Sequence, residues 1–292
     1  MRLIIVSGLS GSGKSVALRV LEDLGYYCID NMPSALLKSV VDEITGGEKP
    51  RSKLLAVGID ARNPHGSLES LPQLVEEIQQ QGIATELLFL QSDDDILLRR
   101  YSETRRRHPL AEHGTALRAA IANERDMLAD VLNASDLVID TSRSSIYELA
   151  DVIRERVDRR ETNTLSIMIE SFGFKYGIPA DADFVFDLRS LPNPYWTLEL
   201  RGLTGRDDEV IRFLDAQPAF GKMFTDIFAF LKKWIPQYES VNRGYLTVAC
   251  GCTGGQHRSV YMADKLARAL RESHDPVLAR HNVLGAHTLS DQ

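Results

Sequence analysis

The sequence predicts an α/β protein with two domains, each built around a parallel β-sheet. In the first half of the chain, five short apolar runs alternate with helix-compatible segments, a pattern typical of a parallel sheet that helices cover on both faces. A glycine-rich segment joins the first run to the first helical pattern, and a second strand–loop–helix pattern stands near the end of the chain. At 292 residues the chain has the length of about two average domains.

The strands of the first domain are predicted from runs of apolar and β-branched residues. They cover residues 3–6, 26–31, 54–60, 86–90 and 137–140, and one intervening helix is predicted over 71–80. Parallel sheets of this kind bind their ligands at the carboxyl ends of the strands. We therefore expect the loop at residues 8–15 to share one edge of the sheet with Asp30, Asp60 and Asp140.

Residues 8–15 match the phosphate-binding pattern G-x4-G-K-S of P-loop NTPases, between a predicted strand and a predicted helix. Backbone N–H groups of such a loop surround phosphate oxygens, and the helix N-terminus adds positive potential. Lys14 is expected to reach the β- and γ-phosphates of ATP or GTP, and Ser15 to give its hydroxyl to Mg²⁺. A glycine-rich turn is the alternative, and the motif alone does not separate hydrolysis, transfer and sensing. The predicted nucleotide-binding residues are Gly8, Leu9, Ser10, Gly11, Ser12, Gly13, Lys14 and Ser15.

A charged segment at residues 93–109 lies between the fourth and fifth predicted strands. Three aspartates suit the start of a helix, arginines suit its end, and Pro109 prevents its continuation. Two interpretations stay open. The segment is either a solvated surface helix or a lid whose Arg100, Arg105 and Arg106 close over phosphoryl oxygens, which guanidinium groups bind well.

A polar stretch at residues 154–163 places the domain boundary near residue 160, giving domains 1–160 and 161–292. Strands are predicted over 165–169, 184–187 and 245–250. Apolar residues at helical spacing between Phe220 and Trp234 form a broad stripe that we expect to be core.

Residues 252–259 form a second predicted anion-binding loop, again between a strand and a helix. A cysteine and an arginine stand six positions apart with glycines between them, as in the loop of cysteine phosphatases. Three interpretations stay open: a phosphate or sugar-phosphate pocket without covalent chemistry, a cysteine phosphatase, and a structural turn. The predicted ligand-binding residues are Cys252, Thr253, Gly254, Gly255, His257, Arg258 and Ser259, with Glu170, Lys175, Asp187 and Arg189 as candidates at neighbouring strand ends.

Composition limits the classes of function. The charged fraction of 26% and hydrophobic fraction of 43% are ordinary for a globular protein, and the sequence has no apolar run of about 18 residues and no signal peptide pattern. We expect a cytoplasmic protein without membrane contact. Three cysteines form no disulfide framework and no zinc pattern. With a formal charge of −7, RNA would have to bind local basic patches.

Seven segments together resemble the bacterial RapZ/YvcJ family of nucleotide-binding proteins: GLSGSGKS, YYCIDN, GIDARN, LLRRYSETRRRHPL, ESFGFKYGIPADADFVFDLR, LPNPYW and GCTGGQHRS. The resemblance implies an N-terminal domain similar to P-loop nucleotide kinases and a C-terminal domain that binds an amino-sugar phosphate. It also implies slow hydrolysis of ATP and GTP, and in some members an adapter role that presents small RNAs to RNase E and regulates amino-sugar metabolism. The family's guanine-nucleotide motif corresponds to Asp60, Ala61, Arg62 and Asn63.

The C-terminal tail departs from the family pattern. RNA-binding members carry a basic tail, whereas residues 279–292 include one arginine and no lysine. We therefore expect the tail to contribute little to RNA binding. From the motifs together we expect a homo-oligomeric regulator with weak ATPase or GTPase activity and a metabolite-sensing second domain. Two alternatives stay open for the whole chain: a small-molecule kinase and an RNA-binding adapter whose nucleotide site has lost its role.

Overall fold

The computed structural model describes residues 1–45, 53–63, 68–104, 107–111, 116–158, 164–241 and 243–284. The chain divides into two compact units, Met1–Arg159 and Arg160–Gln292. Within the described residues, no helix has both the length and the apolar character needed to cross a membrane.

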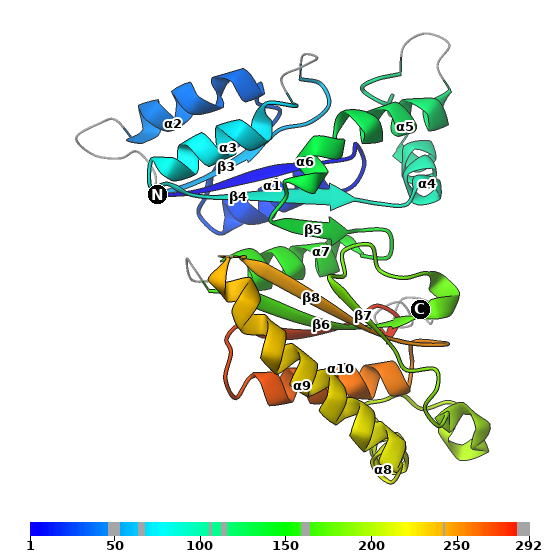
Figure 1. Cartoon of the computed structure of the whole chain (residues 1–292). Helices are drawn as coiled ribbons and strands as arrows, with labels where there is room; N and C mark the ends of the chain where they lie inside the picture. The colour runs from blue at the N-terminus through cyan, green and yellow to red at the C-terminus, as the bar shows by residue number, and fades with distance from the viewer. Residues whose placement is uncertain are drawn as a thin grey trace. The chain divides into compact units, whose positions relative to one another are not determined.

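A five-stranded parallel sheet with the order β2-β3-β1-β4-β5 forms the centre of the first unit (Figure 1). Its apolar runs become strands because each can pair on both sides or pack beneath helices. The predicted strands are confirmed, and the central one pairs with two neighbours at Val6, which lies opposite Gly58 and Leu88. The strands are β1 (Arg2–Gly8), β2 (Tyr27–Ile29), β3 (Leu54–Gly58), β4 (Ala84–Gln91) and β5 (Leu137–Asp140).

Helices cover this sheet on both faces. On one face, α2, α3, α5 and α6 share a hydrophobic cluster with alternate strand residues such as Leu3, Ile5 and Phe89. Helices α1 and α7 contact each other, and α1 packs on β1, β2 and β3. The helices are α1 (Lys14–Asp23), α2 (Leu37–Thr45), α3 (Leu71–Gln80), α4 (Asp94–Thr104), α5 (Leu117–Met127), α6 (Ala129–Asn133) and α7 (Ile146–Val152), with a 3-10 turn η1 (Ser34–Leu36) and a π-helical turn η2 (Ile153–Asp158).

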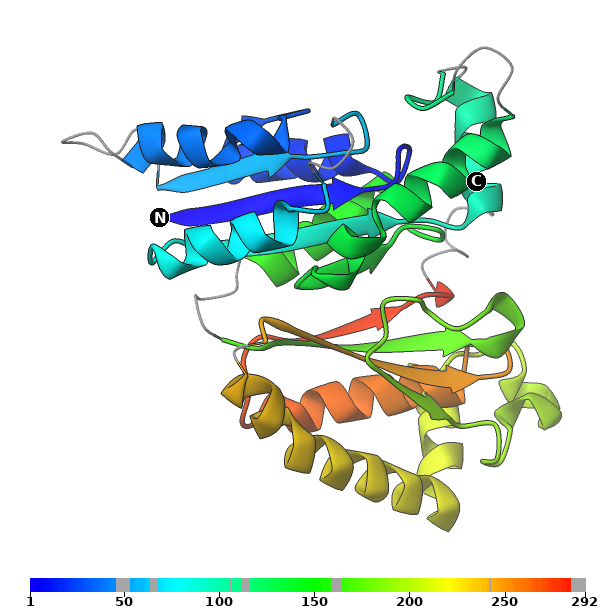
Figure 2. The ribbon, with the colours of Figure 1, turned by 45° about the horizontal axis from the view of Figure 1, so that its top comes forward.

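The second unit has a four-stranded parallel sheet with the order β7-β8-β6-β9 (Figure 2). Inward residues of this sheet, including Ile169, Leu246 and Val277, form one hydrophobic cluster with helices α8, α9 and α10. The elements are β6 (Ser166–Gly173), β7 (Phe184–Asp187), β8 (Tyr245–Cys252), β9 (Val277–His281), α8 (Asp208–Asp215), α9 (Pro218–Ser240), α10 (Arg258–Leu270) and the 3-10 turns η3 (Phe174–Tyr176), η4 (Pro194–Trp196) and η5 (Leu198–Leu200). An α/β fold with a P-loop domain followed by a second α/β domain is thus confirmed.

Three details of the second unit differ from the predictions. Ala279–His281 belongs to strand β9 and not to a free tail, because β9 pairs with β6 along its whole length. Glu170 lies inside β6 and not at its end, since pairing with β8 continues to Gly173. The apolar stripe of α9 is only partly core: Phe220, Ile227 and Leu231 are buried, but Trp234 is 42% exposed. The Trp234 ring contacts Phe230 and Lys233 of its own helix.

Candidate functional site

The loop at residues 8–15 follows the central strand β1 and ends in the first turn of α1. Asp30, Asp60 and Asp140 follow or end β2, β3 and β5, and all these strands run parallel. The structure therefore places the four features at the same edge of the sheet, where ligands of such sheets bind.

Gly8 allows the chain to leave the strand sharply. Its φ of +136° is a conformation that side chains rarely adopt, and an added Cβ would lie 2.0 Å from the carbonyl oxygen of Leu90. The next residue, Leu9, continues the pairing with β4, because its N–H donates to the Leu90 carbonyl oxygen at 3.0 Å. The loop thus starts as a continuation of the sheet.

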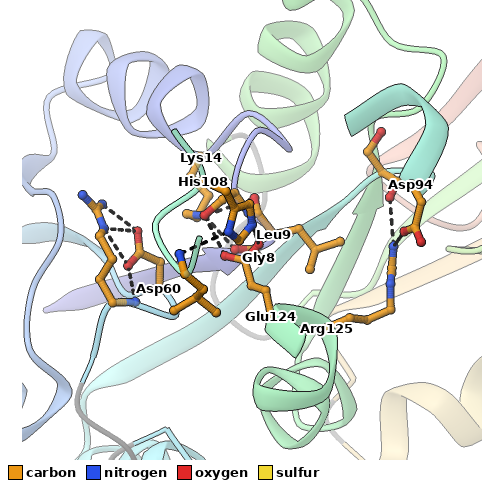
Figure 3. Close-up of polar contacts among 12 residues, drawn as sticks. Gly8, Leu9, Lys14, Asp60, Asp94, His108, Glu124 and Arg125 are labelled. Carbon is orange, nitrogen blue, oxygen red and sulfur yellow. Dashed lines mark hydrogen bonds and ion pairs between the residues drawn. The ribbon is translucent and has the colours of Figure 1, made fainter. Parts of the chain in front are cut away.

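Lys14 folds back over its own loop. Its Nζ donates to the carbonyl oxygens of Gly8 at 2.6 Å and Leu9 at 3.1 Å (Figure 3). Burial lowers the pKa of Lys14, while the charge of Glu124 acts in the opposite direction. Ser15, the predicted Mg²⁺ contact, is exposed. The loop therefore carries a cation whose described partners are neutral carbonyl groups.

A buried carboxylate supports the loop from behind. Glu124 Oε2 accepts from Ser10 N–H at 2.9 Å and from His108 Nε2 at 3.0 Å, and Glu124 Oε1 accepts from the Ser10 hydroxyl at 2.6 Å (Figure 3). Burial works to raise the pKa of Glu124, but the hydrogen bonds from His108 and Ser10 hold it below its ordinary value. Glu124 is therefore an anion within the loop's surroundings.

Arg100 braces the other side of the loop. Its guanidinium donates to the Gly11 carbonyl at 3.0 Å and to the carbonyl and hydroxyl oxygens of Thr141. Thr141 in turn donates to the Ser12 carbonyl at 2.9 Å. Of the predicted lid residues, Arg100 thus supports the loop's backbone, while Arg105 and Arg106 lie outside the described residues.

The D-x-R-N segment after β3 is internally bonded. Asp60 accepts from the Arg62 backbone and guanidinium in a two-pronged contact, with Nη2 2.6 Å from Oδ2. Burial acts to raise the pKa of Asp60, yet the Arg62 hydrogen bonds keep it below its ordinary value. Asn63 accepts from Ser34 N–H and donates to the carbonyls of Met32 and Asp60, and the buried Ala61 completes the turn.

The same clamp recurs in the second unit. After β7, Asp187 accepts from Arg189 through the same four hydrogen bonds, with Nη2 2.7 Å from Oδ2. The two clamps differ in environment, because the Asp60 side chain is 5% exposed and the Asp187 side chain 46%. An Asp-x-Arg clamp after a parallel strand is thus a local turn structure of this chain, with or without a base-binding role.

The second loop holds its cysteine at the base. Cys252 is the last residue of β8, its Sγ lies 3.1 Å from Ser259 Oγ, and Gly255 N–H donates to it at 3.2 Å. Burial would raise the pKa of this thiol, but these hydrogen bonds and the charge of Arg258 lower it overall. Gly255 has a φ of +75°, and an added Cβ would lie 2.7 Å from the Gly173 nitrogen. A thiol whose pKa is lowered therefore lies at the base of this loop.

The two large polar side chains of this loop, Arg258 and His257, contact backbone carbonyl groups of residues 188–200. Arg258 Nη1 donates to the carbonyls of Leu188, Arg189 and Leu191 at 3.4, 3.1 and 2.8 Å. Buried His257 has its Nε2 3.1 Å from the Leu200 carbonyl, and burial lowers its pKa.

The remaining predicted residues lie around the loop. Lys175 N–H donates to the Thr253 carbonyl at 3.2 Å, while its ammonium group lies over the Tyr176 ring. Arg189 pairs with Asp187 and covers the Phe174 ring at 3.9 Å. Thr253 is exposed, and a Cβ added at Gly254 would meet open space. The mouth of the loop is thus lined by exposed charged groups.

Sequence reasoning missed Glu124 and the role of His108. His108 stands in a segment of interest, directly after the arginines, but nothing local points to its partner. Glu124 follows the buried Ala120 and Ile121 at helical spacing, and an acid on the apolar face of a helix is the signal that was available. Across the described residues, no group of three or more His, Cys, Asp or Glu side chains is arranged to hold a metal ion.

Comparisons with known proteins cover both units. Residues 1–161 match the model of a RapZ-like N-terminal domain, and residues 165–285 match that of a RapZ C-terminal domain. A nucleotide-binding protein of Halorhodospira halophila is 51% identical over 284 residues, 97% of this chain and 99% of its own length. One from Thioalkalivibrio sulfidiphilus is 49% identical over 285 residues, 97% of this chain and 100% of its own length.

Solved structures with some likeness include two shikimate kinases. The one from Bacteroides thetaiotaomicron is 14% identical, with 52% of this chain and 94% of that chain covered at a TM-score of 0.34. The one from Acinetobacter baumannii is 20% identical, with 52% and 89% covered at 0.33. The fold assignment rests instead on the strand order and the family match.

Proposed function

The chain belongs to the RapZ family, and from this premise we propose that it is a nucleotide-binding regulatory protein. In this proposal the first domain binds ATP or GTP with Mg²⁺ and hydrolyses it slowly, and the second domain senses a phosphorylated amino sugar. One observation carries the nucleotide site: within the described residues, the hydrogen-bond acceptors of Lys14 Nζ are two neutral carbonyl groups of its own loop, so an arriving phosphate offers it a charged acceptor. The relatives from H. halophila and T. sulfidiphilus carry the name nucleotide-binding protein.

The residues of the loop fit a nucleoside triphosphate with Mg²⁺. Gly8, Gly11 and Gly13 have φ values of +136°, +87° and +109°, which let the backbone turn without side chains at the phosphate side. Ser15 offers an exposed hydroxyl to the metal. Bound Mg²⁺ would neutralise phosphate charge, and Lys14 would hold the phosphate oxygens in place.

Slow turnover is supported by the state of the nearby carboxylates. Asp60 is held by Arg62, and Glu124 is held by Ser10 and His108. Neither is placed to orient an attacking water, a function that fast hydrolysis needs. Asp30 is exposed at the same edge and is the remaining candidate.

The second loop supports metabolite sensing through residues 252–259, with Lys175, Asp187 and Arg189 at its mouth. Exposed cations beside an inward-facing N–H group suit a phosphate ester. A cysteine phosphatase is the second candidate function, favoured by the lowered pKa of Cys252. Phosphate release from p-nitrophenyl phosphate by the wild type, absent in Cys252→Ser, would establish that activity in place of sensing.

An adapter role for small RNAs and RNase E requires basic surface. Residues 279–292 contribute one arginine, Arg280, and it lies in strand β9. We therefore expect weak, strongly salt-dependent RNA binding unless a homo-oligomer combines patches from several chains. Filter binding of a small RNA at graded salt tests this expectation, and tight binding by dilute protein at physiological salt would contradict it.

Titration calorimetry with MgATP and MgGTP tests the nucleotide site. Lys14→Ala should lower the affinity for both by roughly a hundredfold, because charge-assisted contacts to phosphate are lost. Arg19→Ala, an exposed cation on the same helix α1, is the matched control and should bind like the wild type. Equal affinities of Lys14→Ala and the wild type would refute the assignment.

A further inference from the structure

Three segments far apart in the sequence converge on the third residue of the phosphate loop. Glu124 comes from α5, His108 from the segment that follows α4, and Tyr101 from α4 itself. Glu124 is fully buried, and His108 and Tyr101 are 3% and 8% exposed. The His108 and Tyr101 rings lie 5.3 Å apart, and a Cβ added at Gly11 would meet the Tyr101 ring at 3.5 Å. These side chains thus form one packed cluster around Ser10 and Gly11.

The direction of each hydrogen bond in this cluster follows from its geometry. Leu110 N–H donates to His108 Nδ1 at 3.2 Å, so Nδ1 acts as an acceptor. The ring proton of neutral His108 therefore lies on Nε2 and is donated to Glu124. Among the described residues, Glu124 accepts three hydrogen bonds, two from Ser10 and one from His108. The backbone N–H and the hydroxyl of Ser10 are both committed to one carboxylate.

Because Glu124 already accepts three hydrogen bonds, it suits a positioning role better than a catalytic one. A general base needs a lone pair within reach of water or of an acceptor hydroxyl. Glu124 has no exposed surface and already accepts three hydrogen bonds, so it is poorly placed to take a proton from a nucleophile. It is well placed to fix Ser10, because losing it would leave three buried donors without an acceptor.

We propose that Glu124 and His108 are positioning residues that fix Ser10 and thereby hold the loop in the form that accepts nucleotide phosphates. The inference rests on the proposed nucleotide-binding function. It has a rival of opposite sign, in which the Glu124 charge repels the triphosphate and its removal strengthens binding. The sign of the effect on affinity therefore decides between the two.

The test compares variants that separate shape from charge. Glu124→Ala removes all three acceptor contacts and should weaken MgATP binding about tenfold or more. Glu124→Gln keeps two acceptor contacts if its amide oxygen faces Ser10 N–H and His108, and its NH₂ group then donates to the Ser10 hydroxyl oxygen, which reverses the third hydrogen bond. Its affinity should therefore stay within about threefold of the wild type. Ser10→Ala removes the hydroxyl donor and keeps the backbone N–H donor, so it should weaken binding by a few fold and act non-additively with Glu124→Ala.

A matched control removes a second buried carboxylate of the same domain. Glu86 accepts from Arg2 near the starts of β1 and β4, whereas the phosphate loop follows the end of β1. Glu86→Ala should therefore lower thermal stability without changing MgATP affinity. Wild type that binds no MgATP would refute the proposed function itself. Wild type that binds, with Glu124→Ala binding as tightly or more tightly, would overturn the inference. If Glu124→Ala does not fold, unchanged affinity in Ser10→Ala would overturn it equally.

Discussion

The two phosphate-type loops of this chain share a plan and differ in how their cations are used. Both follow a buried parallel strand and run into a helix, at residues 8–15 and 252–259. In the first loop the cation, Lys14, bonds two carbonyls of the loop itself, and a carboxylate lies behind it. In the second loop the cation, Arg258, is 3% exposed and donates to three backbone carbonyls of residues 188–191, outside the loop. The first cation can be redirected to a ligand at little cost to the fold, whereas the second already stabilises the fold.

This difference shows what a loop motif does and does not predict. Spacing of glycines and a basic residue indicates an anion-binding backbone. Whether the basic side chain is available depends on which carbonyls or carboxylates the rest of the fold places beside it. In the proposed second site we therefore expect Arg258 to act mainly by shaping the loop, and the exposed Lys175 and Arg189 to meet a ligand directly.

The largest effect that we expect is the difference in stability between variants that remove the cation of each loop, Arg258 and Lys14. Arg258→Ala removes a buried guanidinium and leaves the Leu188, Arg189 and Leu191 carbonyls without this donor, which should lower the free energy of unfolding by roughly 2–3 kcal/mol. Lys14→Ala should change it by less than about 1 kcal/mol, because its loop carbonyls can then bond water. Urea unfolding measures both.

The two tryptophans make this measurement specific for each domain. Trp196 and Trp234 both lie in the second unit, so tryptophan fluorescence follows that unit, and circular dichroism also follows the first. Arg212→Ala, an exposed arginine of the same unit that pairs with Glu209 on the surface of α8, is the control and should leave the fluorescence midpoint in place. A midpoint unchanged in Arg258→Ala would mean that its carbonyl contacts carry no stability.

Local patterns predicted most of the fold, and contacts between distant segments explain what was missed. Residues 3–6 and 137–139 are continuous apolar runs, so their pattern was sufficient to predict strands. Strand β9 was missed because Val277–His281 includes Arg280 and His281 and becomes a strand only by pairing with β6. Glu124 was missed for the same reason: its partners Ser10 and His108 are more than a dozen residues away in sequence, and only the folded sheet edge brings them together.

A second prediction concerns Cys252, the cysteine at the base of the second loop. The pKa of Cys252 is below its ordinary value of 9.0, whereas burial raises that of Cys250, and burial together with the charge of Glu22 raises that of Cys28 to about 11. Cys252 should therefore ionise first as pH rises, giving thiolate absorbance at 240 nm below pH 9. Cys252→Ser should abolish this step and Cys28→Ser should retain it. A step that survives in Cys252→Ser would place the reactive thiol elsewhere.

The smallest effect concerns the two Asp-x-Arg clamps, which share their hydrogen bonds but not their burial. Asp60 has a pKa lowered by Arg62, so the folded state binds its proton less tightly than the unfolded state, and the clamp's stabilisation is present above the ordinary aspartate value and lost as pH falls below it. Arg62 is half-exposed, so Arg62→Ala should cost under about 1 kcal/mol at pH 7, with the difference from wild type shrinking in acid. Arg189→Ala should give no measurable change, because in the second clamp both the arginine and the aspartate side chains are about half-exposed. If the first clamp also binds the guanine base, Arg62→Ala should shift the ratio of GTP affinity to ATP affinity, because the Asp60 carboxylate then loses the hydrogen bonds from the Arg62 guanidinium. A ratio that stays constant while stability falls would identify the clamp as a turn structure alone.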